Sequence, residues 1–210
     1  MLTPEAAPRV PAAVMPMLQR LFIAIDLPPP VRWQLATLVA EPPRGVRPVP
    51  PAQLHLTLHF LGAVADEDRM ALQPALAAVQ QEPFTIAVRG TGVFPPHGRP
   101  AVLWAGVAES APLGALHAAI AAAIEACGLA VERRPYIPHV TLARLTSGAP
   151  RAWTNRLLAA TADLAIDAIA VDRFLLYESR RLDGPTEHLV AATFPLQPPA
   201  AACRAAARLR

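Results

Sequence analysis

The chain has 210 residues, of which 53% are hydrophobic, and a formal net charge of +3. This length favours one domain or two small fused lobes, and no stretch approaches the roughly 18 to 20 uninterrupted apolar residues of a membrane span. All 19 basic residues are arginine, which excludes lysyl-nucleotide ligases, Schiff-base enzymes and P-loop ATPases, because each of these needs a lysine.

The two ends of the chain differ in composition from its middle. Residues 1–19 are rich in proline and alanine and lack a charged segment followed by an apolar one, so they predict a disordered leader and no secretory signal. Residues 197–210 form an Ala/Arg-rich tail, which leaves 20–196 as the folded domain. Cys127 and Cys203 give neither a disulfide framework nor a metal-ligand cluster, so we expect a cytoplasmic protein.

Hydrophobic periodicity and turn residues predict alternating strands and helices in the folded domain. In chain order, we expect a strand at 20–28, a helix at 31–40, a strand at 54–62 that ends at Gly62, a helix at 66–81, a hairpin of strands at 84–94 and 101–107, a helix at 111–128, a strand at 139–145, a helix at 151–160, and a second hairpin at 174–181 and 187–196. Hairpins mixed with helices predict an α+β fold with mainly antiparallel sheets.

Two of the predicted strands carry the same motif, which is His, an apolar residue, Thr and Leu. It begins at His55 in HLTL and again at His139 in HVTL. Since alternate side chains of a strand share a face, each copy presents an imidazole beside a hydroxyl, from Thr57 and Thr141 respectively. The same alternation would place His59 on the motif face as well.

Several chemistries can use histidines, and most of them fit this sequence poorly. His55 and His59 have the i, i+4 spacing of a zinc-binding helix, but no Glu follows His55 and the segment predicts a strand. No G-x-S-x-G motif or suitable cysteine supports a covalent nucleophile. Paired imidazoles and hydroxyls suit metal-free acid–base catalysis on a phosphate, in which one histidine takes a proton and the other gives one.

The chain resembles the two-histidine (2H) phosphoesterase superfamily, and within it the bacterial and archaeal RNA 2′,3′-cyclic phosphodiesterases, formerly named 2′-5′ RNA ligases. The resemblance rests on the paired motifs and on the stretches RLFIAIDLP, RPAVLWAGV, RPYIPHVTLAR and DRFLLYESR, and covers about residues 20–196. It implies two similar lobes with outer helices related by a pseudo-twofold axis, an active-site cleft between them, and hydrolysis of a 2′,3′-cyclic phosphate at an RNA end to a 2′-phosphate with no metal or cofactor.

The resemblance also implies roles for individual residues. His55 matches the proton donor to the leaving oxygen, His139 matches the base that activates water, and Thr57 and Thr141 match the phosphate-binding hydroxyls. Arg144 matches a basic residue near the phosphate, although strand parity puts it opposite His139, so a bulge or strand end would have to bring it round.

Other residues and functions remain open. Tyr136, just before the second motif, is a candidate for stacking on a base or for packing in its own loop. The alternatives to RNA-end hydrolysis are action on a small cyclic phosphate or a 2′-5′ linkage, and a non-catalytic RNA-end binding protein. We expect a monomer with no membrane partner.

Overall fold

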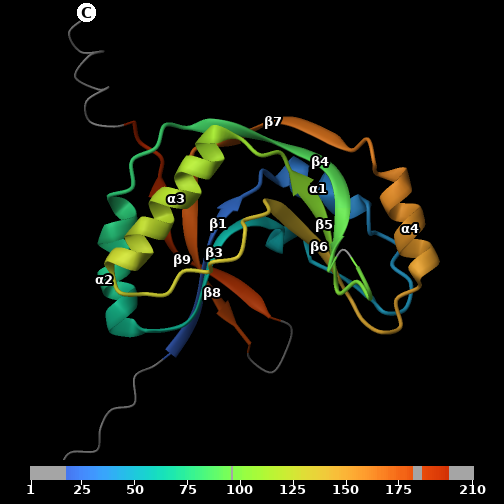
Figure 1. Cartoon of the computed structure of the whole chain (residues 1–210), viewed down its shortest axis with the longest axis horizontal. Helices are drawn as coiled ribbons and strands as arrows, with labels where there is room; N and C mark the ends of the chain where they lie inside the picture. The colour runs from blue at the N-terminus through green and yellow to red at the C-terminus, as the bar shows by residue number, and fades with distance from the viewer. Residues whose placement is uncertain (1–17, 96, 182–185, 199–210) are drawn as a thin grey trace, which may run out of the picture.

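The structure is a computed structural model that describes residues 18–95, 97–181 and 186–198 (Figure 1). The predicted leader and tail lie almost entirely outside these residues. The elements are β1 (Leu18–Asp26), α1 (Pro29–Thr37), β2 (Val46–Pro48), the 3-10 helix η1 (Pro51–Gln53), β3 (His55–Ala65), α2 (Asp66–Ala77), β4 (Phe84–Phe94), β5 (Val102–Val107), α3 (Ala111–Ala126), β6 (His139–Leu145), α4 (Arg151–Ala160), β7 (Ala165–Val171), β8 (Arg173–Arg180) and β9 (Glu187–Pro195).

The strands of the described residues form one curled antiparallel sheet in the order β7-β4-β5-β6-β3-β1-β8-β9, with β2 added to β6. Its two halves meet between β3 and β6, where Leu56 is the partner of Val140. Each half places a motif strand at this junction, followed by three further strands on the outer side. The predicted α+β class with two similar antiparallel lobes is therefore confirmed.

The two halves are built differently from the sequence. One half, β6-β5-β4-β7, comes from a single stretch of chain, whereas the other, β3-β1-β8-β9, combines the start of the domain with its final hairpin. The last hairpin, β8 and β9, packs beside β1 through pairs such as Phe22 with Tyr177. Beyond β1, the first motif strand is thus supported by strands more than a hundred residues away in sequence.

The helices and the apolar face of the sheet enclose the main core. Leu56 and Val140 of the motif strands are fully buried in it. Helix α3 contributes Leu113, Leu116, Ile120 and Ile124, whose spacing lines one side of a helix. The motif strands are therefore anchored from behind by the core.

Three features differ from the expected elements. β7 and β2 were not predicted as strands. β3 does not end at Gly62, as predicted, but continues to Ala65. Gly62 takes a positive φ of 71° within the strand. Within the described residues, no helix is long and apolar enough to span a bilayer.

Candidate active site

The two predicted motifs meet at the centre of the sheet. His55 and His139 are the first residues of β3 and β6, and the pairing of Leu56 with Val140 joins the strands immediately beside them. Because this pairing is antiparallel, the side chains on either side of it share the face opposite the core. We call this the motif face; it carries His55, Thr57, His139 and Thr141.

Both imidazoles are held in the same way by the backbone. Nδ1 of His55 lies 2.7 Å from the carbonyl oxygen of Gln53, and Nδ1 of His139 lies 2.8 Å from that of Ile137. A carbonyl oxygen only accepts hydrogen bonds, so each Nδ1 carries the hydrogen. In the neutral imidazole, Nε2 is then the atom that takes a proton, and each motif has the same tautomer.

Aromatic side chains surround each histidine. The ring of His55 stacks on Phe22 with centroids 4.9 Å apart, and the ring of Tyr177 lies 5.1 Å from that of Phe22 and 5.9 Å from that of His55. His139 contacts the ring of Phe94 edge-on at 5.0 Å. These contacts restrict the rotation of both imidazoles and exclude water from one side of each.

A further histidine, His188 of β9, lies beside His55. Its ring meets that of His55 edge-on with centroids 5.3 Å apart, and its Nδ1 is buried with no hydrogen-bond partner among the described residues. Burial lowers the pKa of His188, and the nearby charge of Arg144 lowers it further. Arg144 from one half of the sheet therefore lies close to His188 from the other.

The environment of His55 strongly favours its neutral form. Desolvation lowers its pKa to about 4, the bond to Gln53 opposes this change, and the charges of His188 and His139 add to the lowering. In the absence of an anion, His55 is therefore neutral near pH 7. An anionic group bound beside it would favour the protonated form.

A β-bulge follows the threonine in both motif strands. On β3, Thr57 pairs with Ala24 and His59 with Ile23, which leaves Leu58 as the extra residue. On β6, the residues flanking Leu142 pair with consecutive residues of β5 in the same way. Two successive side chains then point into the core, and the alternation is reversed beyond each bulge.

The bulge in β6 brings Arg144 onto the motif face, where its side chain is exposed. The sequence allows Arg144 to lie near the histidines only if a bulge or a strand end intervenes, and a bulge is present. The equivalent position after the bulge in β3 is occupied by Phe60, which is 62% exposed and lies 6.2 Å from the ring of Phe22. The two halves thus carry a cation and an apolar ring at corresponding places.

The bulge in β3 makes the predicted position of His59 wrong. Its side chain is only 4% exposed and points into the helix-covered side, where Nε2 donates a hydrogen bond to the carbonyl oxygen of His117 at 2.9 Å. The His59 and His117 rings stack with centroids 4.0 Å apart. His55 and His59 consequently face opposite sides of the sheet and cannot share a metal ion.

Tyr136 belongs to the same cluster on the helix-covered side. Its ring stacks on His117 at 4.0 Å, and its hydroxyl donates a hydrogen bond to the carbonyl oxygen of Thr57 at 3.2 Å. Stacking on a substrate base by this ring is therefore not supported. Tyr136 instead ties the loop before the second motif to the backbone of the first.

Among the residues that the structure describes, no three His, Cys, Asp or Glu side chains gather as a metal-binding group.

The sequence reasoning missed the contribution of His188, which is separated from both motifs along the chain. It also missed the aromatic neighbours of the motif histidines. Alternation within β9 alone does not reveal which strand lies beside it, so no local signal identified His188.

The chain is similar to a known protein family and to solved structures. The model of the 2′-5′ RNA ligase superfamily matches residues 27–183. The RNA 2′,3′-cyclic phosphodiesterase of Thermus thermophilus is 42% identical over 143 residues, which cover 63% of this chain and 71% of that protein. The enzyme of the same name from Escherichia coli is 38% identical over 135 residues, which cover 62% and 74%. A crystal structure of E. coli LigT complexed with 3′-AMP has a TM-score of 0.69 and 30% identity, and the match covers 85% of this chain and 98% of that one.

Proposed function

Because the chain belongs to the 2′-5′ RNA ligase superfamily, we propose that it hydrolyses 2′,3′-cyclic phosphates at RNA ends to 2′-phosphates, with its two motif histidines as acid and base and without a metal ion. The observation that carries this proposal is the meeting of two H-x-T motifs on one face, each with Nδ1 bound to a carbonyl oxygen. The relatives named RNA 2′,3′-cyclic phosphodiesterase support the substrate.

The reaction needs one proton removed and one supplied. Nε2 of His139 takes a proton from water, whose oxygen attacks the phosphorus atom. The bond between phosphorus and the 3′ oxygen breaks, and protonated Nε2 of His55 gives its proton to that oxygen. The products are a 2′-phosphate and a 3′-hydroxyl, and a proton exchange with solvent returns both histidines to their starting forms.

The remaining groups bind the phosphate. The hydroxyls of Thr57 and Thr141 donate to its non-bridging oxygens, and Arg144 supplies a positive charge on the same face. The charge of the incoming phosphate also raises the affinity of His55 for a proton, so the acid is formed in the complex. This coupling suits a site in which His55 is neutral beforehand.

The test is to incubate the protein with a short RNA that ends in a 2′,3′-cyclic phosphate and to identify the product by chromatography against 2′- and 3′-phosphate standards. We expect the 2′-phosphate, and we expect His55→Ala and His139→Ala to reduce turnover by at least about a hundredfold. His97→Ala, which changes an exposed histidine outside both motifs, is the matched control. A 3′-phosphate product, or full activity in both motif variants, would contradict the proposal.

A further inference from the structure

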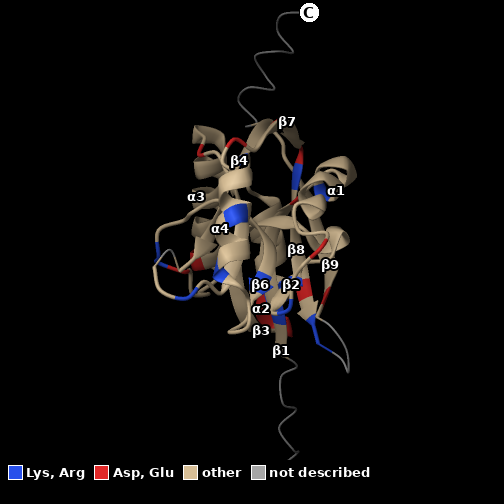
Figure 2. Cartoon of the chain, turned by 90° about the vertical axis from the view of Figure 1, so that its right-hand side faces the viewer, with Lys and Arg blue, Asp and Glu red and all other residues tan. Residues whose placement is uncertain are grey.

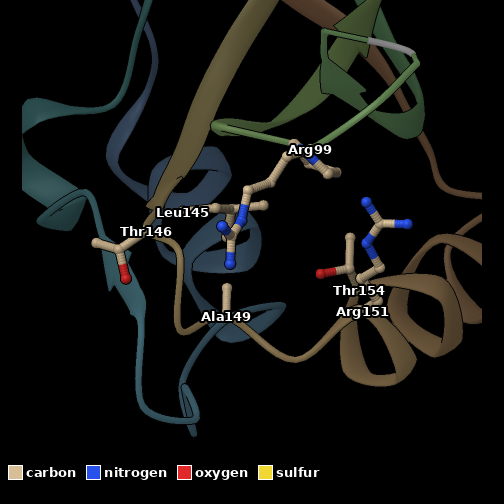
Figure 3. A pocket seen from close by; sticks show the side chains of 7 residues that line it. Arg99, Leu145, Thr146, Ala149, Arg151 and Thr154 are labelled. Carbon is tan, nitrogen blue, oxygen red and sulfur yellow. The ribbon is translucent and has the colours of Figure 1, made fainter.

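A second basic site lies beyond the end of β6. A cavity of about 390 Å³ is bounded by the turn between β4 and β5, by the end of β6, and by the start of α4 (Figure 3). Its lining residues are Arg99, Pro100, Leu145, Thr146, Ala149, Arg151 and Thr154. The cavity therefore brings two arginines together beside the hydroxyl of Thr154.

The two arginines retain most of their capacity to bind an anion. Arg99 donates to the carbonyl oxygen of Ser147, and Arg151 donates to that of Gly98 at 3.1 Å. Each guanidinium has five N–H groups, so these contacts leave several donors for another partner. Within the described part of the chain, no carboxylate lies within ion-pair distance of either arginine.

The shape of the cavity also suits an anion. The guanidinium of Arg99 reaches down over Ala149, and the hydroxyl of Thr154 points into the same space (Figure 3). The side chain of Thr154 is only 4% exposed, so its position is fixed by packing. The first turn of α4 lies at the edge of the cavity, and the partial positive charge of a helix N-terminus adds to that of the arginines.

A second pair of arginines, on the motif face, directly precedes the cavity along β6. Leu145, which lines the cavity, directly follows Arg144, and Arg144 is the cross-strand partner of Arg47 on β2. Like charges directly opposite on a sheet repel each other, and no carboxylate of the described residues pairs with these two either. Figure 2 looks onto this side of the molecule and shows basic segments on α4, β2 and β6.

The length of this basic surface exceeds one nucleotide. β6 has seven residues from His139 to Leu145, and at about 3.3 Å per residue it extends over roughly 20 Å. A phosphate that is hydrolysed beside His139 therefore lies too far from Arg99 and Arg151 for either arginine to contact it. An RNA chain that continues away from its cyclic end could follow the arginines along β6 to the cavity.

We infer that the cavity between Arg99 and Arg151 binds a backbone phosphate of the RNA several nucleotides before its cyclic end. This inference rests on the proposed function and specifies its substrate as an oligonucleotide and not a mononucleotide. Planar guanidinium groups bind phosphate oxygens in pairs, so Arg99 and Arg151 together can hold a phosphate from two sides. The contact carries no base information, so it serves RNA ends of any sequence.

The experiment compares three substrates with the full-length protein: a nucleoside 2′,3′-cyclic phosphate, and RNAs of about two and about eight nucleotides that end in the same group. Arg99→Gln, Arg151→Gln and their combination remove the proposed contact. Arg156→Gln, on the exposed side of the same helix and outside the cavity lining, is the control. Binding of the fluorescently labelled eight-nucleotide 2′-phosphate product is measured by anisotropy at several salt concentrations, independently of turnover.

We expect the double variant to lose about tenfold or more in kcat/KM on the long RNA and to keep the wild-type value on the two short substrates. The dependence of log Kd on log salt concentration should become shallower by about 0.7 for each phosphate contact that is lost. Thermal unfolding identifies any variant whose loop no longer folds, and the other single variant then carries the test.

Three results would overturn the inference. The first is an equal loss on all three substrates, which would indicate that the arginines act through the catalytic site. The second is unchanged binding and turnover of the long RNA, as for Arg156→Gln. The third is a loss on the eight-nucleotide RNA that occurs only when this RNA is made with a 5′-terminal phosphate, which would assign the cavity to a chain end. If the wild-type protein hydrolysed none of the substrates, the proposed function would fail, and the anisotropy would still decide whether the arginines bind RNA.

Discussion

Replacing His55 by alanine tests how the work is divided between the two histidines. Burial brings the pKa of His55 to about 4, and relative to the usual value of about 6.5 this makes protonation harder by roughly 3 kcal/mol. A phosphate anion about 4 Å away contributes roughly 4 kcal/mol in the opposite direction at an effective dielectric constant of 20. The bound substrate can therefore create the acid that it needs.

This acid matters most for a leaving group that departs poorly without a proton. The 3′ oxygen of ribose is such a group, so His55→Ala should reduce turnover of a cyclic nucleotide by about a thousandfold, within the range known for general acid catalysis. A nitrophenolate leaves readily unprotonated, so the loss on a nitrophenyl phosphodiester should be at least about tenfold smaller. His139→Ala removes the base for water and should be similarly impaired on both substrates.

The assay is steady-state turnover of both substrates by the wild-type protein and the two variants at the same pH, with product formation followed by chromatography and by nitrophenolate absorbance. Equal losses on both substrates in His55→Ala would show that His55 does not act as the proton donor. A larger loss on the cyclic nucleotide in His139→Ala would show that the two roles are reversed.

Three more outcomes are expected. Turnover should survive prolonged EDTA treatment, and activity that disappears with the chelator and returns with Zn²⁺ would refute the metal-free reaction. Gly92→Ala should lower both stability and activity, because a Cβ there would overlap the ring of Trp104, which lies 6.2 Å from that of His139; wild-type thermal unfolding and turnover would show that the ring moves aside freely. Stability to urea should fall between pH 6.5 and pH 4, because burial lowers the pKa of both His55 and His117 to about 4 and the unfolded chain therefore binds more protons in this range. His117→Leu should flatten that decrease, and parallel curves for variant and wild type would contradict the linkage.

The placement of the motif residues on one face could be predicted from the sequence because it is local to each motif. His55 with Thr57, and His139 with Thr141, each occupy alternate positions of one strand, so a single period-2 argument places them together on one face. The repetition of the motif then indicates that two strands cooperate. The structure adds that these strands are neighbours joined at Leu56 and Val140.

The position of His59 could not be predicted in this way, because period-2 alternation holds only in an uninterrupted strand. The extra residue at Leu58 reverses the alternation, and nothing in the letters HLTLHFLG distinguishes a bulged strand from a regular one. The corresponding bulge in β6 explains why Arg144 reaches the motif face. The same kind of β-bulge therefore explains why the prediction for His59 was wrong and why Arg144 lies on the motif face.

Long-range neighbours could not be predicted for a different reason. β7 has the sequence AIDAIAV, in which small alanines weaken the apolar pattern, and it is held at the edge of the sheet by pairing with β4. His188 meets His55 only because β8 and β9 return to the first half of the sheet. Both depend on tertiary pairing between segments that are distant in sequence.

The near-twofold relation between the motifs raises a problem of orientation. If the two halves of the site were identical, a cyclic phosphate would bind equally well in either of two poses related by a half-turn, and either histidine could act as the proton donor. We expect the positions after the bulges to favour one of these poses, because Arg144 occupies one and Phe60 the other. Exchanging these two residues should therefore invert the preferred pose. A protein that keeps every motif histidine and threonine would then bind its substrate turned by half a rotation.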